Sequence, residues 1–202
     1  MKREADYTIK GFLYQFNKTL QQVISEPEGT EITVEGIIED IDVESPNGIR
    51  AIQCKYHETK ENYRLSDISK PILQMLVHYS KNIDKNIQYV LYAHFSKEEF
   101  GEKNLSTEDL NTILSTKNKQ YIANYISQIK PPIDPGINTL ISKLKKTTSD
   151  LIKISEYYNL TKGLSLTIDI ADFNKPEKFK FILGKPYDVL IDDTKKNDTK
   201  KM

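Results

Sequence analysis

The sequence predicts an α/β fold in which helices flank a mixed β-sheet. Three observations support this prediction. Apolar side chains recur at helical spacing from Ala5 to Ile24, residues 31–56 are rich in β-branched residues around a turn, and residues 68–95 combine a helical stripe with a short apolar run. An order of helix, strands, helix and strand favours a mixed sheet covered by helices.

Composition describes a globular chain with a well-charged surface. The 202 residues include 29 basic and 29 acidic side chains, so the formal net charge is zero and gives no indication of nucleic acid as a partner. No run approaches the roughly 20 apolar residues that a membrane helix needs, and the N-terminus does not resemble a secretory signal. We therefore expect a cytoplasmic protein that does not enter a membrane.

Cysteine usage narrows the choice of metal. The only cysteine, Cys54, cannot form an internal disulfide or a cysteine-based zinc cage. Its strand position points to the core, so we expect a buried structural thiol. Metals with oxygen ligands remain the ones to consider.

The N-terminal helix is predicted from an apolar stripe, which we expect to face the core. The stripe steps by three and four residues and consists of Phe12, Phe16, Leu20, Val23 and Ile24. Pro27 and Gly29 end the helix.

The strands that follow are predicted to form an antiparallel pair. Residues 31–43 are rich in β-branched side chains, and Gly36 marks either a bulge or a break into two strands. The segment Ser45–Gly48, with sequence SPNG, has the composition of a turn. Residues 49–56 then return as the second strand.

Further elements follow along the chain. We expect a helix over residues 68–79 and a mostly buried strand over residues 88–95. Ser106 or Thr107 caps a third helix that has acidic residues in its first turn. Further helices are predicted over residues 120–129 and 137–154, and a strand pair over residues 164–170 and 179–183.

This order of elements predicts three regions. Residues 1–100 form the core domain, and residues 101–192 form a helical extension that includes the strand pair. Residues 193–202 form a disordered basic tail, because that segment has no apolar anchor.

One polar patch carries the chemistry. Side chains alternate along a strand, so Asp40 and Asp42 share one face of the first strand, and Gln53 and Lys55 share one face of the second. A register that hides both apolar sets brings these polar sets together. Carboxylate and amide oxygens suit Mg²⁺, which makes hydroxide available near neutral pH. Lys55, about 6 to 7 Å along the strand from Gln53, can neutralise charge that develops on a phosphate.

The motifs resemble the PD-(D/E)XK nuclease superfamily. Asp42 followed by a turn and then by Gln53-x-Lys55 matches the Q-x-K variant found in Mrr-type restriction endonucleases. It is also similar to the endonuclease domain of Cap-type effectors in bacterial anti-phage operons. The segment Gly11–Gln15 matches the early helix signature of that group, and Glu35–Asp42 matches its acidic strand.

The resemblance implies a restriction-endonuclease-like αβββαβ core and a role for each motif residue. Asp42 is the metal-binding aspartate, with Asp40 as a rival, and Gln53 takes the place of the second acidic ligand. Lys55 is the catalytic lysine. Mg²⁺ is the expected cofactor, and Mn²⁺ is a substitute.

Two further residues are accessory in this resemblance. Gln15 approaches the site from the early helix, although an ordinary packing contact explains the Gly11–Gln15 pair equally well. Glu35 is an additional carboxylate, which strand parity places on the face opposite Asp42 unless a bulge at Gly36 brings it round.

The resemblance implies double-stranded DNA as the substrate and Mg²⁺-dependent endonuclease activity in bacterial anti-phage defence. Only three of the 29 basic residues are arginine, so contacts with the DNA backbone are expected rather than base readout. Tentative DNA contacts are Lys143, Lys145 and Lys146. The family also implies a homodimer, or a subunit of a defence complex with a sensor or NTPase protein.

A different class of function fits the same residues. In this alternative the chain is a catalytically inactive nuclease-like module that binds a partner protein or nucleic acid within a defence complex. Activity with a divalent cation discriminates between the two hypotheses.

Overall fold

The computed structural model describes residues 2–115 and 162–185, and they divide into two compact units. One unit contains the β-sheet and α1 (Lys2–Ser25), and the other contains α2 (Leu65–Ser80), α3 (Thr107–Ile113) and α7 (Ile170–Phe173). No helix within these residues is long and apolar enough to cross a membrane. The helices predicted over residues 120–129 and 137–154, and the tail from residue 193, lie outside the described residues.

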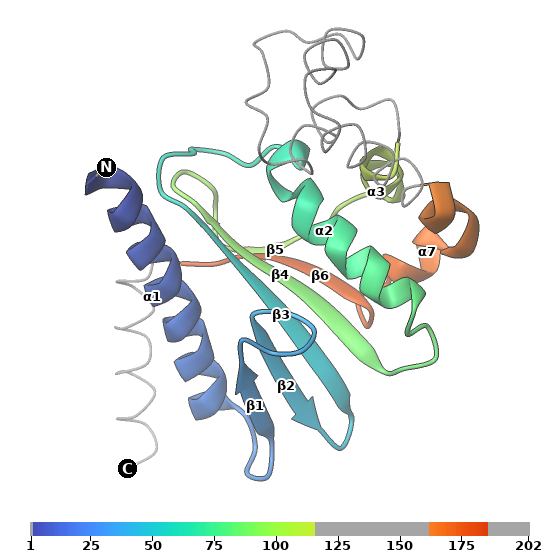
Figure 1. Cartoon of the computed structure of the whole chain (residues 1–202), viewed down its shortest axis with the longest axis horizontal. Helices are drawn as coiled ribbons and strands as arrows, with labels where there is room; N and C mark the ends of the chain where they lie inside the picture. Colours follow the sequence, from blue (N-terminus) through green and yellow to red (C-terminus); the bar gives the residue numbers. More distant parts are fainter. Residues whose placement is uncertain (1, 116–161, 186–202) are drawn as a thin grey trace, which may run out of the picture. The chain divides into compact units, whose positions relative to one another are not determined.

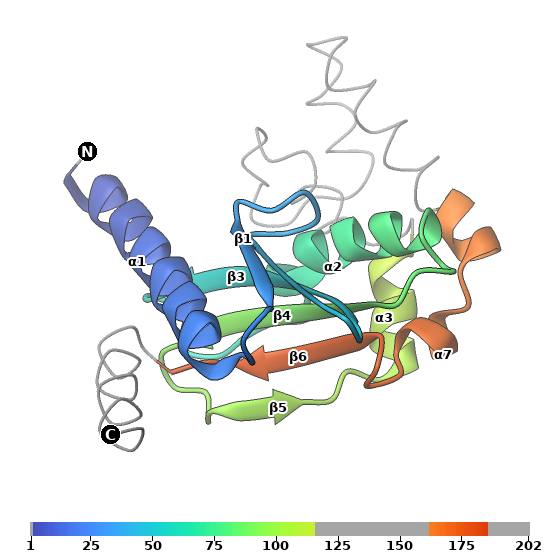
Figure 2. The same cartoon turned by 90° about the horizontal axis from the view of Figure 1, so that it is seen from below.

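The sheet is mixed and six-stranded, in the order β1-β2-β3-β4-β6-β5 (Figures 1 and 2). Its strands are β1 (Glu31–Val34), β2 (Ile41–Ser45), β3 (Gly48–His57), β4 (Ile87–Phe95), β5 (Gly101–Lys103) and β6 (Phe179–Leu183). Strands β3, β4 and β6 run parallel, while β1–β2, β2–β3 and β5–β6 are antiparallel. The predicted α/β class with a mixed sheet is confirmed.

The turn between β2 and β3 follows the sequence prediction. Ser45 pairs with Gly48, so Pro46 and Asn47 form the two-residue connection. Gly48 has φ of 134°, and a Cβ there would lie 2.6 Å from the backbone oxygen of Asn86. Glycine is therefore required at this position for conformation and for space.

Gly36 marks a break and not a bulge. β1 ends at Val34 and β2 begins at Ile41, and residues 35–40 form the loop of an antiparallel hairpin. Glu35 has φ of 50°, and its N–H donates to the Asp40 carbonyl across the loop at 2.8 Å. The loop therefore connects two separate strands, which is one of the two alternatives that the sequence left open.

The extent of α1 is predicted correctly, but its orientation is not. The stripe expected in the core is exposed: Phe12 and Phe16 are each 63% exposed, and Val23 is 57% exposed. The side facing the sheet presents Tyr14, which is fully buried and stacks on Tyr92 with ring centroids 5.3 Å apart. Figures 1 and 2 show α1 beside the sheet.

The polar residues on the buried side of α1 are Gln15, Asn17, Thr19 and Gln22. Buried polar groups of this kind are tolerated where they find hydrogen-bond partners, as Gln15 and Thr19 do. Helical periodicity reveals an apolar face, but it does not reveal what covers that face.

The core beneath α1 contains one residue of the helix and residues of β2, β3 and β4. It contains Tyr14, Ile41, Val43, Ile52, Cys54, Val90 and Tyr92. Cys54 is a buried free thiol, as predicted.

The C-terminal strand corrects two expectations. Residues 162–167 and α7 are helical, so the strand predicted over residues 164–170 is wrong. β6 is a strand, but its neighbours are β4 and β5. Residues 179–183 therefore belong to the same sheet as β1–β4 and do not form a separate strand pair.

The second unit consists of helices. Of the two predicted caps, Ser106 is the one that caps α3, by accepting a hydrogen bond from the Asp109 N–H at 3.0 Å. The Tyr79 hydroxyl of α2 donates to the Asp172 carboxylate of α7 at 2.5 Å. The ring of Phe173 lies 5.2 Å from that of Tyr79, so the two helices share an aromatic contact.

Candidate functional site

The β2–β3 hairpin brings the predicted polar side chains to one face of the sheet. Ile41 pairs with Ile52 and Asp42 pairs with Ala51, so Asp42, Gln53 and Lys55 lie on the same face by strand alternation. The apolar partners Ile41 and Ile52 lie on the other face, in the core beneath α1. The predicted register of the hairpin is confirmed.

Asp40 is the carboxylate that meets Gln53. The side-chain amide of Gln53 donates to the Asp40 carboxylate, which also accepts the backbone N–H of Cys54 at 2.8 Å. Asp40 is half-buried, whereas Gln53 is only 6% exposed. A partly accessible carboxylate therefore lies against the amide that was predicted to complete the site.

Asp42 has a structural contact set. Its two carboxylate oxygens accept the backbone N–H groups of Ile38 and Glu39, at 2.9 and 3.2 Å, and its side chain is 3% exposed. Gly36 packs against it so closely that a Cβ there would lie 2.3 Å from Oδ2. The Asp42 carboxylate therefore holds the loop of residues 35–40. This geometry favours Asp40 over Asp42 as the residue that faces a ligand.

Gln15 reaches the same loop from α1. Its amide donates to the Glu35 carboxylate at 3.0 Å and lies 3.5 Å from the Asp40 carbonyl oxygen. Glu35 comes close to Asp40 because β1 ends before it. The two accessory residues thus lie near Asp40, but the side chains of Gln15 and Glu35 are hydrogen-bonded to each other.

Glu39 is a member of this group that sequence reasoning missed. Burial raises the pKa of Glu39 to about 8, and the neighbouring Asp40 charge adds to the rise, while Lys55 opposes it. Burial likewise raises the pKa of Asp40, against the opposing effects of the Cys54 N–H and of Lys55. The run Glu39-Asp40-x-Asp42 could have indicated Glu39 in the sequence, because adjacent acids in a turn can both face one lysine.

Lys55 is the positive charge of the group. It is half-buried on β3 and lies near enough to Glu39 and Asp40 to stabilise the ionised form of both carboxylates. An ammonium beside two acids is suited to balancing charge on an anionic substrate or a transition state. We call Glu35, Glu39, Asp40, Gln53 and Lys55 the acidic hairpin site.

Oxygen donors in the acidic hairpin site are those that Mg²⁺ prefers. Burial raises the pKa values of Glu39 and Asp40, and a divalent cation beside them would favour their ionised forms. Within residues 2–115 and 162–185, however, no three His, Cys, Asp or Glu side chains form a metal-binding group. A cation here would depend on the Gln53 amide oxygen and on water as well as on the carboxylates.

The tentative DNA contacts Lys143, Lys145 and Lys146 lie outside the described residues. Their position relative to the acidic hairpin site therefore stays a prediction.

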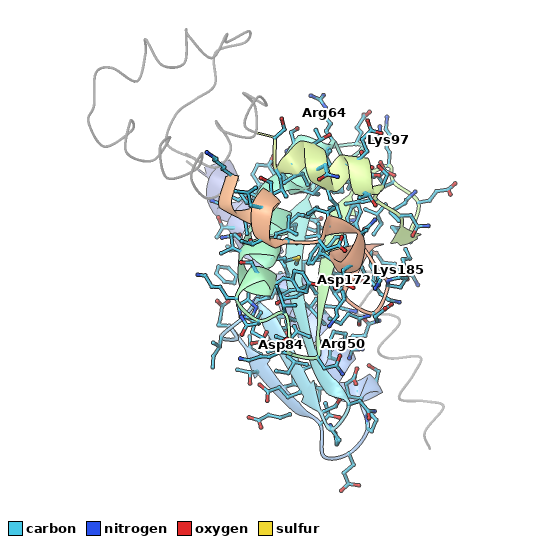
Figure 3. All side chains as sticks on the ribbon, turned by 90° about the vertical axis from the view of Figure 1, so that its right-hand side faces the viewer. Arg50, Arg64, Asp84, Lys97, Asp172 and Lys185 are labelled. Carbon is cyan, nitrogen blue, oxygen red and sulfur yellow. The ribbon has the colours of Figure 1, made fainter. Side chains whose placement is uncertain are left out.

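A pocket of about 250 Å³ lies at the turn end of the hairpin, away from this site. Arg50 lines it and forms an ion pair with Glu26. Figure 3 shows Arg50 and Asp84 toward the same end of the sheet. The pocket includes none of the acidic hairpin site residues, so it does not extend the chemistry proposed for them.

Comparisons with known proteins give no indication of function, so a functional assignment depends on the geometry of the site. No family model, no curated protein and no solved structure matches this chain.

Proposed function

We propose that the protein is a Mg²⁺-dependent endonuclease that hydrolyses phosphodiester bonds of DNA on a restriction-endonuclease-like fold. The observation that carries this proposal is the contact between Asp40 and Gln53, with Lys55 two residues further along the same face of β3. An acid just before β2 and an amide and an ammonium on β3 are side chains of the types that the resemblance implies, with Asp40 in the place of its rival Asp42.

Asp40 and Gln53 would hold the metal, with Glu39 or Glu35 as the additional acid. The Gln53 amide now donates to Asp40, and rotation of the amide about its last bond presents its oxygen instead. A bound Mg²⁺ supplies Lewis acidity and a water of lowered pKa. Asp42, whose oxygens accept two backbone N–H groups, keeps the loop in place and is not assigned as a ligand.

Lys55 would act on the substrate. Its ammonium can donate a hydrogen bond to a phosphate oxygen and stabilise the negative charge that grows there during attack. Before substrate arrives, the carboxyl groups of Asp40 and Glu39 lie close enough to the same ammonium for their pKa values to be affected by it. The phosphate would therefore compete with these acids for Lys55.

Double-stranded DNA in bacterial anti-phage defence is the substrate and setting that the family resemblance supports. The basic residues are mostly lysine, which favours contact with the phosphate backbone without strong sequence preference. Binding should weaken steeply as salt rises. We also propose a cytoplasmic location and a partner that senses infection or hydrolyses a nucleotide.

A plasmid-nicking assay tests the proposal. The wild-type chain should nick supercoiled DNA with Mg²⁺ or Mn²⁺ and stop with EDTA. Lys55→Ala should lower the rate by about 100-fold or more, because a positioned charge at the transition state contributes effects of this size. Lys97→Ala, at an exposed lysine paired with Glu61, is the matched control and should cut normally. Equal cutting by wild type and Lys55→Ala would refute the role of Lys55.

One observation favours the alternative of a catalytically inactive binding module. No three acidic, histidine or cysteine side chains form a metal-binding group among the described residues, and Gln53 replaces a charged ligand. Under this alternative the wild-type chain binds DNA or a partner protein but never cuts it with any divalent cation. DNA binding that is unaffected by EDTA, without nicking, would identify that module.

A further inference from the structure

The outer side of α1 is an apolar surface. It consists of six large side chains that are between 39% and 63% exposed: Ile9, Phe12, Leu13, Phe16, Leu20 and Val23. We call these residues the α1 outer face. Large exposed apolar patches are uncommon on monomeric proteins and mark interaction surfaces.

Charge is absent from the α1 outer face between Ile9 and Val23. The two lysines of this span are directed to other contacts: Lys10 pairs with Glu58, and the Lys18 ammonium lies 4.3 Å from the Tyr92 ring centroid. Burial lowers the pKa of Lys18 to about 8. A surface without charge can meet an identical surface without repulsion, whereas a charged one cannot.

The order of the side chains is symmetric about Phe16. Ile9 and Val23 each lie seven residues from Phe16, and Phe12 and Leu20 each lie four residues from it. A spacing of seven residues keeps side chains on one seam between two helices. Read in either direction, the seam presents the same sequence of apolar positions.

We propose that the α1 outer face binds the same face of a second copy of this chain, with the two helices antiparallel and the two-fold axis passing by Phe16. Phe16 then meets Phe16 of the other copy, and Ile9 meets Val23. Two-fold contacts require a self-complementary patch, which is the property that the symmetry about Phe16 provides. Antiparallel helices also place opposite ends of their dipoles side by side.

The area of the α1 outer face suits such a dimer. Large apolar and aromatic side chains have surfaces of about 200 Å² each, so six that are half exposed offer about 600 Å² per copy. Two copies would bury about 1,200 Å², which lies at the lower end of the range of about 1,200 to 2,000 Å² for stable interfaces. The seam from Ile9 to Val23 is about 21 Å long, equal to two heptads.

Measuring the molar mass of the full chain by light scattering tests this dimer. Over about 1 to 100 μM, which brackets micromolar affinity, the average molar mass of the wild-type chain should rise with concentration toward twice the chain mass. Phe16→Glu should reduce this to one chain mass, because it puts two carboxylates at the axis. Leu166→Glu changes a side chain that is 77% exposed in the other unit, and this control should remain dimeric.

Engineered cysteines test the antiparallel geometry without depending on Phe16→Glu. Under mild oxidation Phe16→Cys should crosslink to a covalent dimer, because the axis brings the two copies of this position together. Ile9→Cys alone should not, since the two copies would lie about 21 Å apart along the seam. Ile9→Cys combined with Val23→Cys should crosslink. The native Cys54 is buried and does not compete.

Several results would overturn the proposal. A wild-type chain that stays monomeric throughout the concentration range excludes it, as does a dimer that survives Phe16→Glu. Crosslinking of Ile9→Cys alone would indicate a parallel arrangement. Monomers that bind anionic phospholipid vesicles, and lose this binding with Phe16→Glu, would show that the face meets a lipid surface instead of a second copy.

Discussion

The side-chain amide of Gln53 donates a hydrogen bond to the carboxylate of Asp40, which joins the loop before β2 to the middle of β3. Asp42, two residues further along, instead accepts two N–H groups of its own loop. Two acids with the same strand parity thus have different surroundings. The distinction matters because it separates a residue that can face a ligand from one that maintains the fold.

Replacing each of these acids by asparagine should separate the two roles. Asp40→Asn keeps an oxygen for the Cys54 N–H, so stability should change little while nicking falls by about 100-fold. Asp42→Asn leaves one of the Ile38 and Glu39 N–H groups without its acceptor and should cost about 1 to 3 kcal/mol of unfolding free energy. Urea unfolding and the plasmid assay measure both effects. If Asp42→Asn abolished nicking and Asp40→Asn lowered stability, Asp42 would be the metal ligand.

Glu39 should make stability fall with rising pH. Its pKa is raised from 4.5 to about 8 in the folded protein, so between these values the folded state holds a proton that the unfolded chain has released. The free energy of unfolding therefore decreases through this window and levels off above it. In EDTA, Glu39→Gln should gain stability relative to wild type at about pH 9 compared with about pH 5.

Glu28→Gln provides the control for Glu39→Gln, because Glu28 is exposed and the change in net charge is the same. Its stability difference from wild type should vary less with pH. If both variants show the same dependence, net charge and not the surroundings of Glu39 accounts for the effect.

Mg²⁺ binding should release a proton near neutral pH. A cation that uses Glu39 must displace the proton that burial retains there, so affinity should rise with pH up to about 8. Calorimetric titration in two buffers with different ionisation enthalpies measures the released proton directly. Glu39→Gln should abolish this release. Binding that is independent of pH would remove Glu39 from the metal site but would leave Asp40 and Gln53 untested by this measurement.

Gly36→Ala should destabilise the loop of residues 35–40. An added Cβ would lie 2.3 Å from Oδ2 of Asp42, too close for any contact, so the loop or the carboxylate must move. We expect a loss of about 1 to 3 kcal/mol in unfolding free energy. Gly163→Ala, where a Cβ meets no atom within 4 Å in a helical segment, should be neutral or stabilising. Equal effects of the two substitutions would contradict the packing of Gly36 on Asp42.

Phe181→Ala should show that β6 belongs to the core of the sheet. The Phe181 side chain is fully buried on a strand between β4 and β5, so truncation should cost about 3 to 5 kcal/mol. Leu166→Ala, at a side chain that is 77% exposed, should change stability by less than about 0.5 kcal/mol. Urea midpoints of the two variants give the comparison. A small effect at Phe181 would support a sheet complete without β6.

Local chemistry made the hairpin predictable. The Pro46-Asn47 turn fixed the register of β2 and β3, and with it the common face of Gln53 and Lys55. Strand alternation and turn composition act over a few residues, so they can be inferred from the sequence alone. The cap at Ser106 and the helix that it begins follow for the same reason.

Features set by distant contacts were not predictable in this way. The stripe with Phe12 and Phe16 has the periodicity of a core face, but the sheet instead covers the side with Tyr14, whose ring stacks on Tyr92. The separation of Asp40 from Asp42 depends on how residues 35–40 fold back, which strand parity does not describe. The place of β6 beside β4 depends on pairing between segments far apart in the chain.

The insertion of β6 between β4 and β5 has a consequence for synthesis on the ribosome. β4 is translated well before β6, and at cellular elongation rates the delay is on the order of ten seconds. During that time one side of β4 lacks its parallel neighbour, and open strand edges readily recruit other chains. A nascent chain of this protein should therefore benefit from a chaperone until residue 183 has emerged.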